Sequence, residues 1–340
     1  MNYSKCWKKK RGTKGIRVKP EFAEAESLIS NREHFVIASH VRPDGDAVGS
    51  LLALARSLRL QGKQTIPVLA EGIPPEFDFL PDVGEVRTKP PHKFEALIAV
   101  DVTDIERLGE YFVELNRQPE LNIDHHPTNA HFADVNIVDP TAAATAEILF
   151  DFMRALDLPM DVSVATQLML GLVTDTIGFR TPNVTAKTFT VAAKLIELGA
   201  PLAELYERAL NRRSFIAARY WGHGLSQLEQ HDGVVLATLT LEDRRAAGYP
   251  GKDDSNLINL VSTIEEARIA ILLVEQEGGK VKISWRSRGE ANVADIATSF
   301  GGGGHFQAAG AIILGDVESV KMKVLSASLA ALDGALELGR

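Results

Sequence analysis

A short apolar run that ends in polar residues and is followed by a helical pattern constrains this chain most. Residues 35–38 have the composition of a buried strand, and from Ala47 onward the apolar residues recur at helical spacing. His40, Asp44 and Asp46 lie in the loop between the two. In an open α/β sheet, ligands bind at the loops that follow the carboxyl ends of the strands. This stretch therefore predicts a strand, a ligand-binding loop and a helix.

Two simpler interpretations of the acidic loop stay open at this point. Asp46 could be the N-cap of the helix, and Asp44 with Gly45 could form an Asx turn. A calcium loop of the EF-hand type fits less well, because the glycine and the terminal glutamate that it needs are missing in register. The choice depends on residues further along the chain.

Two further strands and one helix are expected to end in the same kinds of residue. Residues 94–100 and 121–123 are apolar runs of strand length, and a helix is expected over about 162–173. The polar residues that follow these elements are Asp101, Asp124, His125, His126 and Asp175. A carboxylate at the C-terminus of a helix is disfavoured by the helix dipole, and a bound cation would reverse that preference.

The carboxylates and imidazoles together predict a metal site. Hard oxygen ligands with a minority of imidazoles suit Mn²⁺ best, and Mg²⁺ or Fe²⁺ next. The carboxylates are too many for one ion, whereas two ions about 3.5–4 Å apart could neutralise them. Such a pair clamps the attacking and leaving oxygens of a phosphoryl displacement, and a water between the ions would ionise near neutral pH.

The composition excludes several other classes of protein. The net charge of −8 argues against a protein that coats DNA. The single cysteine, Cys6, rules out a disulfide framework and a cysteine-rich zinc site. No apolar segment reaches the ~18 residues that a membrane span needs, and the start lacks the apolar centre of a signal peptide. We therefore expect a cytoplasmic protein with no membrane contact.

The length of 340 residues predicts about two domains. Residues 1–20 are basic and are expected to be a disordered tail, with a nucleic-acid-binding arm as the alternative. We expect an N-terminal α/β domain over 21–198 with a doubly wound, mainly parallel sheet. A helical linker over 199–214, which begins with a Gly-Ala-Pro boundary signal, would lead to a smaller α/β domain with a mixed sheet over 215–340.

Two local predictions concern segments next to the polar residues. A helix is expected to open at Pro140 and Thr141 and to continue through Met153. A run of four glycines with His305 is expected to follow a helix over 293–300 and to precede a strand over 311–314.

The ordered motifs resemble those of the DHH phosphoesterase superfamily over about residues 31–182. Its four motifs are matched by His40-x-x-x-Asp44-x-Asp46, Asp101, Asp124-His125-His126 and Asp175. The second domain is similar to the DHH-associated C-terminal domain in its Ser-Trp-Arg-Ser-Arg stretch at 284–288 and its Gly-Gly-Gly-Gly-His stretch at 301–305. The pairing and the length look most like the branch of bifunctional oligoribonucleases and 3′-phosphoadenosine-5′-phosphate phosphatases, the nanoRNases.

This resemblance implies a role for each motif residue. The ligands of one ion would be His40, Asp44 and Asp101. The ligands of the other, with Asp101 bridging the pair, would be Asp46, Asp101, His125 and Asp175. Asp124 would orient an imidazole, and His126 would donate a proton to the leaving oxygen. Asp101, Asp124 and His126 are therefore the expected catalytic residues.

The resemblance also implies a substrate-binding set in the second domain. Arg286 and His305 would make charge-assisted bonds to the substrate phosphate, with Ser287 as a weaker partner. The backbone N–H groups of Gly303 and Gly304 could approach a phosphate or base closely, because no Cβ intervenes.

The function expected from the resemblance is a two-metal phosphoesterase that uses two Mn²⁺ ions, with Mg²⁺ possible. Its substrates would be short single-stranded RNA oligonucleotides, cut to nucleoside monophosphates, and 3′-phosphoadenosine-5′-phosphate, cut to AMP. Hydrolysis of linear or cyclic dinucleotides stays open as an alternative, as does a nucleotide-binding module without catalysis. A homodimer is expected only from family likeness.

Overall fold

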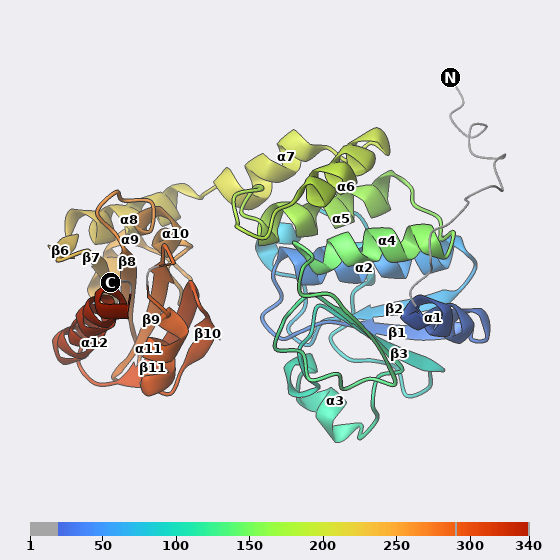
Figure 1. Ribbon diagram of the computed structural model, residues 1–340, viewed down its shortest axis with the longest axis horizontal. Coiled ribbons are helices and arrows are strands. Elements are labelled where there is room, and N and C mark those ends of the chain that lie inside the picture. The colour runs from blue at the N-terminus through green and yellow to red at the C-terminus, as the bar shows by residue number, and fades with distance from the viewer. Residues whose placement is uncertain (1–19, 290, 339–340) are drawn as a thin grey trace. The chain divides into compact units, whose positions relative to one another are not determined.

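The computed structural model describes residues 20–289 and 291–338 (Figure 1). The chain divides into two compact units, Met1–Arg212 and Arg213–Arg340, which are described here one at a time. The basic tail expected over residues 1–20 falls almost entirely outside the described residues, and so does Cys6. Within the described residues, no helix has the length and apolar character needed to cross a membrane.

The first unit is built on a parallel sheet of five strands in the order β2-β1-β3-β4-β5. The strands are β1 His34–Ala38, β2 Gln64–Val68, β3 Ala96–Val100, β4 Leu121–Asp124 and β5 Val135–Val138. The chain starts in the interior of the sheet at β1, adds β2 on one side, and then continues on the other side with β3. This reversal brings the carboxyl ends of β1, β3 and β4 next to one another, where α/β sheets bind ligands.

Helices cover both faces of this sheet, which confirms the doubly wound prediction. They are α1 Pro20–Ser30, α2 Gly45–Leu60, α3 Glu110–Glu114, α4 Thr145–Ala155, α5 Val162–Asp175, α6 Ala186–Glu197 and α7 Leu202–Tyr206. Alternate residues of β1 point to opposite faces, so Phe35 and Ile37 join the core beneath α2 and α5. Val36 and Ala38 join a second core with Phe112 of α3 (Figure 1).

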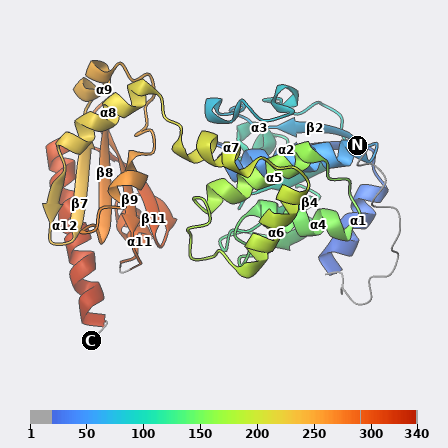
Figure 2. The same ribbon diagram turned by 90° about the horizontal axis from the view of Figure 1, so that it is seen from above.

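Helices α2 and α5 pack closely because small residues lie between them (Figure 2). A Cβ atom on Gly49 would come within 2.3 Å of the Gln167 carbonyl oxygen. A Cβ atom on Gly171 would come within 2.4 Å of Oδ1 of Asp46. Larger residues at these two positions would push the helices apart, so the contact depends on glycine.

Two helix starts differ from the prediction. Helix α2 begins at Gly45 rather than Ala47, and its N-cap is Asp44, whose Oδ1 accepts from the backbone N–H groups of Asp46 and Ala47 at 3.0 Å. Asp46 is therefore not the cap. Helix α4 begins at Thr145 rather than Pro140, because Asp139 first forms a turn in which its Oδ1 accepts from Thr141.

The second unit is built on a mixed sheet of six strands in the order β10-β11-β9-β8-β7-β6. The strands are β6 Glu229–His231, β7 Val234–Leu239, β8 Ile269–Gln276, β9 Lys280–Ser287, β10 Gly303–His305 and β11 Ala308–Leu314. Only β7 and β8 pair in parallel, and the other neighbours are antiparallel. The predicted mixed sheet is confirmed.

Helices cover both faces of this sheet as well. They are α8 Phe215–Ser226, α9 Leu241–Ala247, α10 Leu257–Val261, α11 Val293–Ser299 and α12 Val317–Leu338. One core packs around Trp285 beneath α11 and α12, and the other packs around Tyr220 and Leu257 of α8 and α10. Helix α7 and the π-helix Glu207–Asn211 that continues it belong to the first unit.

Part of the glycine run belongs to a strand that precedes the one predicted over 311–314. Gly303–His305 is β10, which pairs antiparallel with β11, and β11 begins at Ala308 rather than at residue 311. Glycine permits this tight hairpin, because a Cβ on Gly302 would lie 2.2 Å from the Gly310 carbonyl oxygen. A Cβ on Gly304 would lie 2.4 Å from the Ala308 carbonyl oxygen. Helical and strand periodicity could not reveal this pairing in four identical residues.

Candidate metal centre

The polar residues predicted in the first half of the chain meet at the carboxyl edge of the first sheet. Three groups of residues could each hold an ion, because the ligand atoms within each group all lie within 4.8 Å of one another. They are His40, Asp44 and Asp101; Asp46, His125 and Asp175; and Asp101, His125 and His126. The loops after β1, β3 and β4 and the end of α5 supply all of them, because these ends are neighbours in the fold.

The first group surrounds His40. Its Nε2 lies 3.5 Å from Oδ2 of Asp101 and 3.9 Å from Oδ1 of Asp44. The other ring nitrogen, Nδ1, lies 2.9 Å from the Val41 carbonyl oxygen. A proton on Nδ1 would donate to that carbonyl and leave the Nε2 lone pair facing the two carboxylates, which is the arrangement found in histidine metal ligands.

The second group lies on the other side of Asp101. Nε2 of His125 is 3.5 Å from Oδ2 of Asp175 and 3.8 Å from Oδ1 of Asp101. One oxygen of Asp101 therefore faces His40 while the other faces His125. Such a placement suits a carboxylate that is shared between two ions.

Asp101 holds this central place through its backbone. Its φ angle is 56°, in the left-handed region that non-glycine residues rarely adopt. This conformation costs on the order of 1 kcal/mol and tends to persist at functional sites. The side chain is 1% exposed, and its Oδ1 accepts a hydrogen bond from the Thr145 hydroxyl at 2.9 Å. No local pattern of residues indicated this strained turn.

Asp46 is fixed by the N-terminus of α4. Its carboxylate accepts from the backbone N–H groups of Thr145 at 2.6 Å and Ala146 at 3.1 Å, and from the Ser50 hydroxyl at 3.0 Å. The missing side chain of Gly171 leaves the space that the carboxylate occupies. Helix N-termini stabilise anions, so α4 holds a buried negative charge beside the second group.

Asp124 is fully engaged as an orienting group. Its Oδ1 accepts from the backbone N–H of His125 at 2.9 Å and lies 2.8 Å from Nδ1 of His126. Its Oδ2 accepts from the side-chain amide of Asn129 at 2.6 Å. The contact with Asp124 holds the His126 ring beside Asp101. Nδ1 of His126 lies 3.7 Å from Oδ1 of Asp101.

The charges in this cluster oppose one another. Burial and then the charges of Asp101 and its acidic neighbours raise the pKa of Asp46 well above its ordinary value, and they act in the same way on Asp175. Burial also acts to raise the pKa of Asp101, but the hydrogen bond with His40 and the nearby imidazoles bring it below its ordinary value. Burial lowers the pKa of His126, and the hydrogen bond with Asp124 outweighs this and raises it to about 9.

These shifts indicate a site that is short of positive charge. Burial lowers the pKa of His40 too, yet the hydrogen bond and charge of Asp101 give a net increase. Within the described residues, no lysine or arginine forms an ion pair with the five clustered aspartates. Buried carboxylates without basic partners are stable when they coordinate metal, and oxygen-rich sets with a few imidazoles suit hard divalent ions. The residues present therefore fit a pair of such ions.

Sequence reasoning missed four residues that build this site. Thr145 bonds to both Asp46 and Asp101, while Ser50, Asn129 and Gly171 each contact one aspartate. Asp46 and Ser50 are four residues apart on one helix, and this spacing could have predicted the contact between their side chains. The role of Thr145 depends on where α4 begins, which the sequence placed several residues too early.

In the second unit, the strand β9 carries Arg286 between two alanines. Ala270 of β8 and Ala308 of β11 are its register partners, so small side chains flank the guanidinium group. Nη1 donates to the Trp285 carbonyl oxygen at 3.0 Å, and no carboxylate within the described residues forms an ion pair with it. Burial lowers the pKa of Arg286, and the charge of Asp254 opposes this only in part. A half-buried cation without an anionic partner is suited to bind an anion.

The other predicted substrate-binding residues lie at the end of β9 and on β10, and the side chain of His305 is outside the described part of the structure. Ser287 donates its backbone N–H to the Gln307 carbonyl oxygen, and its Oγ lies 3.1 Å from the Gly289 nitrogen, whose N–H it accepts. Among the described residues, Ser287 Oγ only accepts hydrogen bonds, so its hydroxyl proton can serve a ligand. In the β10–β11 hairpin, His305 pairs with Ala308, the register partner of Arg286. A Cβ on Gly303 would meet no atom within 4 Å, so this backbone faces open space.

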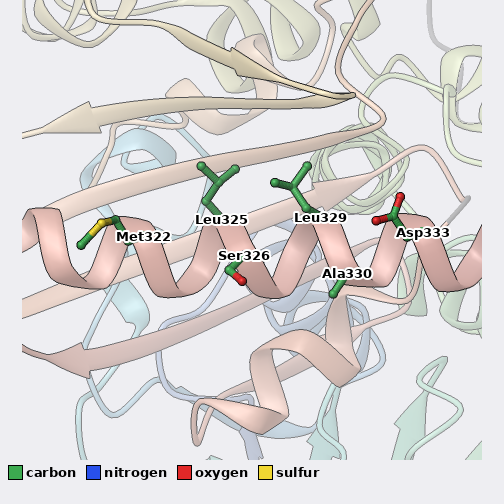
Figure 3. A pocket seen from close by; sticks show the side chains of 6 residues that line it. All are labelled: Met322, Leu325, Ser326, Leu329, Ala330 and Asp333. Carbon is green, nitrogen blue, oxygen red and sulfur yellow. The ribbon is translucent and has the colours of Figure 1, made fainter.

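A separate hollow of about 420 Å³ lies along the last helix, α12 (Figure 3). Its lining residues are Met322, Leu325, Ser326, Leu329, Ala330 and Asp333. These side chains come from one helix and include no imidazole and no cation. The hollow offers a single carboxylate and no group that would bind a phosphate, so the chemistry is assigned to the aspartate and histidine cluster.

Comparison with known proteins agrees with this assignment. Residues 34–172 match the N-terminal domain of the DHH family, and residues 232–331 match the DHHA1 domain. The bifunctional oligoribonuclease and PAP phosphatase NrnA of Thermus thermophilus is 37% identical over 89% of this chain and 91% of its own length.

Two further similarities are more distant. The cyclic-di-AMP phosphodiesterase PdeA of Listeria monocytogenes is 23% identical over 82% of this chain but only 45% of its own length. The crystal structure of an exopolyphosphatase-related protein from Bacteroides fragilis superposes with a TM-score of 0.85 over 94% of this chain and 97% of that chain, at 24% identity. At that identity the likeness concerns the fold alone.

Proposed function

Because the chain belongs to the DHH family of metal-dependent phosphoesterases, we propose that it hydrolyses short RNA oligonucleotides to nucleoside monophosphates. We propose further that it converts 3′-phosphoadenosine-5′-phosphate to AMP and phosphate. The proposal is supported by the relative from Thermus thermophilus, whose name gives both activities and whose length is matched almost throughout.

The observation that carries the proposal is the placement of Asp101 between two ligand groups. One group offers His40 and Asp44, the other His125 with further carboxylates, and the oxygens of Asp101 face both. We propose that His40, Asp44 and Asp101 hold one ion, and that Asp101 bridges to a second. The remaining ligands of the second ion would be Asp46, His125 and Asp175.

We propose Mn²⁺ as the ion, with Mg²⁺ as the alternative. Mn²⁺ suits a set that includes imidazole ligands, whereas Mg²⁺ prefers oxygen ligands alone. When bound, such a pair supplies positive charge that polarises a phosphate ester and makes water more acidic. The protein contributes rigidity, because α4 and Thr145 hold Asp46 and Asp101 in place before any substrate arrives.

His126 is proposed to donate a proton to the leaving oxygen, and Asp124 is proposed to orient His126. Asp124 accepts from His126, and this contact favours the protonated imidazole, whose pKa is raised to about 9. A protonated His126 can donate to the leaving oxygen when the ester bond breaks. Asn129 and the backbone N–H of His125 hold Asp124, so the proton donor is kept in one orientation.

The second unit is proposed to bind the part of the substrate that does not react. Arg286 and His305 would bind a phosphate, with the Ser287 hydroxyl as a weaker donor. The backbone N–H groups at Gly303 and Gly304 would add hydrogen bonds, since a ligand can approach Gly303 without meeting a side chain.

A substrate panel tests this function. The purified chain would be incubated with a labelled RNA trimer, 3′-phosphoadenosine-5′-phosphate, a linear and a cyclic dinucleotide, and pyrophosphate, with Mn²⁺ or with a chelator. We expect the trimer and the bisphosphate to be hydrolysed, and only with metal. Preferred hydrolysis of the cyclic dinucleotide would instead favour the activity named for the Listeria relative. Equal rates with chelator would contradict the proposal.

Two properties of the whole molecule remain predictions. A homodimer would sediment at about twice the chain mass of 37.0 kDa in analytical ultracentrifugation. If the protein is cytoplasmic, cell fractionation should find it in the soluble fraction and not in the fraction that osmotic shock releases.

A further inference from the structure

The tip of the β10–β11 hairpin carries an aromatic side chain that the proposed function does not use. Phe306 and Gln307 form the turn between His305 and Ala308. The Phe306 side chain is 51% exposed. By contrast, Phe300 of the same segment packs against Trp285, with ring centroids 6.2 Å apart. Core packing therefore explains Phe300 and leaves Phe306 unexplained.

The backbone beneath Phe306 is held firmly. Its carbonyl oxygen accepts from the Val293 N–H at 2.9 Å, at the start of α11. The next carbonyl, that of Gln307, accepts from the Ser287 N–H at 2.9 Å, at the end of β9. The exposed ring thus projects from a turn that is fastened to two neighbouring elements. A ring on such a base can receive a ligand without a large loss of backbone entropy.

Phe306 also lies next to the anion-binding residues in register. Ala308, two residues further on, is the strand partner of Arg286, and Gln307 bonds to Ser287. The end of β9 and the β10–β11 hairpin beside it therefore carry a guanidinium group, open glycine backbone at Gly303 and an exposed aromatic ring. A phosphate alone needs the first two, whereas a nucleotide offers a flat base as well.

We propose that Phe306 is the stacking platform for a nucleobase of the substrate. This inference rests on the proposed function, because it assumes a nucleotide substrate. Every base has a π-face, so a phenyl ring accepts all four bases, which suits an enzyme that degrades RNA of mixed sequence. Arg286 would hold a phosphate while Phe306 holds the base of the same or the adjacent nucleotide.

A chemical double-mutant cycle tests the stacking directly. KM and kcat would be measured for wild type and Phe306→Ala on an RNA trimer and on matched trimers with an abasic residue at either end. With the intact trimer, we expect Phe306→Ala to raise KM about 10-fold and to change kcat little. With the trimer that lacks the stacked base, the same substitution should change KM less than 2-fold.

Further variants separate stacking from simple apolar contact and from misfolding. Phe306→Tyr and Phe306→Trp should keep the wild-type KM, whereas Phe306→Leu should resemble Phe306→Ala. Phe215→Ala, which removes a ring that is 79% exposed at the start of α8, is the matched control and should leave KM unchanged. Thermal unfolding of each variant should stay close to wild type.

Two outcomes would overturn the inference while the proposed function stands. In one, Phe306→Ala raises KM equally for intact and for both abasic trimers, so that ring and base are not coupled. In the other, Phe306→Leu behaves as wild type, so that any apolar side chain suffices. If wild type hydrolyses neither the trimer nor 3′-phosphoadenosine-5′-phosphate with Mn²⁺, the proposed function itself is wrong.

Discussion

The two regions proposed to bind metal and substrate are built on opposite physical plans. The aspartate and histidine cluster of the first unit is charged and mostly buried, and it depends on a strained backbone at Asp101. The region of the second unit formed by the end of β9 and the β10–β11 hairpin is partly open, carries the cation Arg286 and depends on glycines in the hairpin. In the proposed function, the first region would hold ions in a fixed geometry and the second would admit a variable substrate. The difference places buried acidic charge at the proposed metal centre and open backbone at the proposed substrate-binding region.

This contrast predicts the largest effect for Asp101. Replacement by asparagine keeps the size and removes the charge that faces both ligand groups. We expect turnover of the RNA trimer to fall by about 10³-fold or more. Because the imidazoles hold the pKa of Asp101 below its ordinary value, Asp101→Asn also removes a stabilising charge, so metal-free thermal stability at neutral pH should fall, which circular dichroism would check. Near-normal turnover with Mn²⁺ would contradict the central place of Asp101.

Gly171→Ala should show how tightly the buried region is packed. The new Cβ would lie 2.4 Å from Oδ1 of Asp46, so the carboxylate must move away from His125 and Asp175. We expect Mn²⁺ affinity to fall about 10–100-fold in calorimetric titration. Gly222→Ala in α8 is the matched control, since a Cβ there meets nothing within 4 Å, and it should leave Mn²⁺ binding unchanged.

Gly303→Ala tests the opposite character of the open edge. A Cβ at this position meets no protein atom within 4 Å, so the fold should tolerate it. If a substrate approaches the backbone here, KM for the RNA trimer should rise about 10-fold while Mn²⁺ binding stays as in wild type. Gly304→Ala provides the contrast, since it should lower thermal stability through its clash with the Ala308 carbonyl oxygen. An unchanged KM in Gly303→Ala would remove this backbone from the binding surface.

Thr145→Val sharpens the role of preorganisation in the buried region. The substitution keeps the shape and removes the hydroxyl that donates to Asp101, while the backbone N–H to Asp46 remains. We expect a smaller loss, about 5–10-fold in Mn²⁺ affinity, with recovery in Thr145→Ser. Equal losses in the valine and serine variants would point to packing rather than to the hydrogen bond.

The smallest predicted effect concerns pH and the metal-free protein. The pKa of His126 is raised from its ordinary value near 6.5 to about 9, so its stabilising contribution is complete below pH 6.5 and is lost as pH rises through 9. The raised pKa values of Asp46 and Asp175 act in the same direction, because ionising them is unfavourable in the fold. With chelator, Tm should therefore fall between pH 6.5 and 9.

Asp124→Asn is the control for that pH dependence. It removes the charged partner that hydrogen-bonds to His126, so the decline in Tm over the same pH range should become shallower. A steeper decline in the variant would show that another group controls the pH dependence.

The sequence predicted the positions of the polar residues better than the contacts between them. A parallel sheet places the ends of apolar runs at one edge, so Asp101 and His125 could be expected near His40. The left-handed φ of Asp101 and the bonds from Thr145 to two aspartates depend on the approach of α4, which no local pattern encodes. The glycine hairpin was missed because four glycines carry no periodicity, and only the packed backbone shows why Gly302 and Gly304 are needed.

The measurement that tests the account most directly is the number of ions bound per chain. Mn²⁺ would be titrated into metal-free protein and counted by calorimetry and by elemental analysis after dialysis, for wild type and Asp101→Asn. The account predicts two ions for wild type, with turnover that appears as the second ion binds, and loss of at least one ion in the variant. A single ion in active wild type, or two ions retained by Asp101→Asn, would contradict the shared carboxylate on which the proposed chemistry depends.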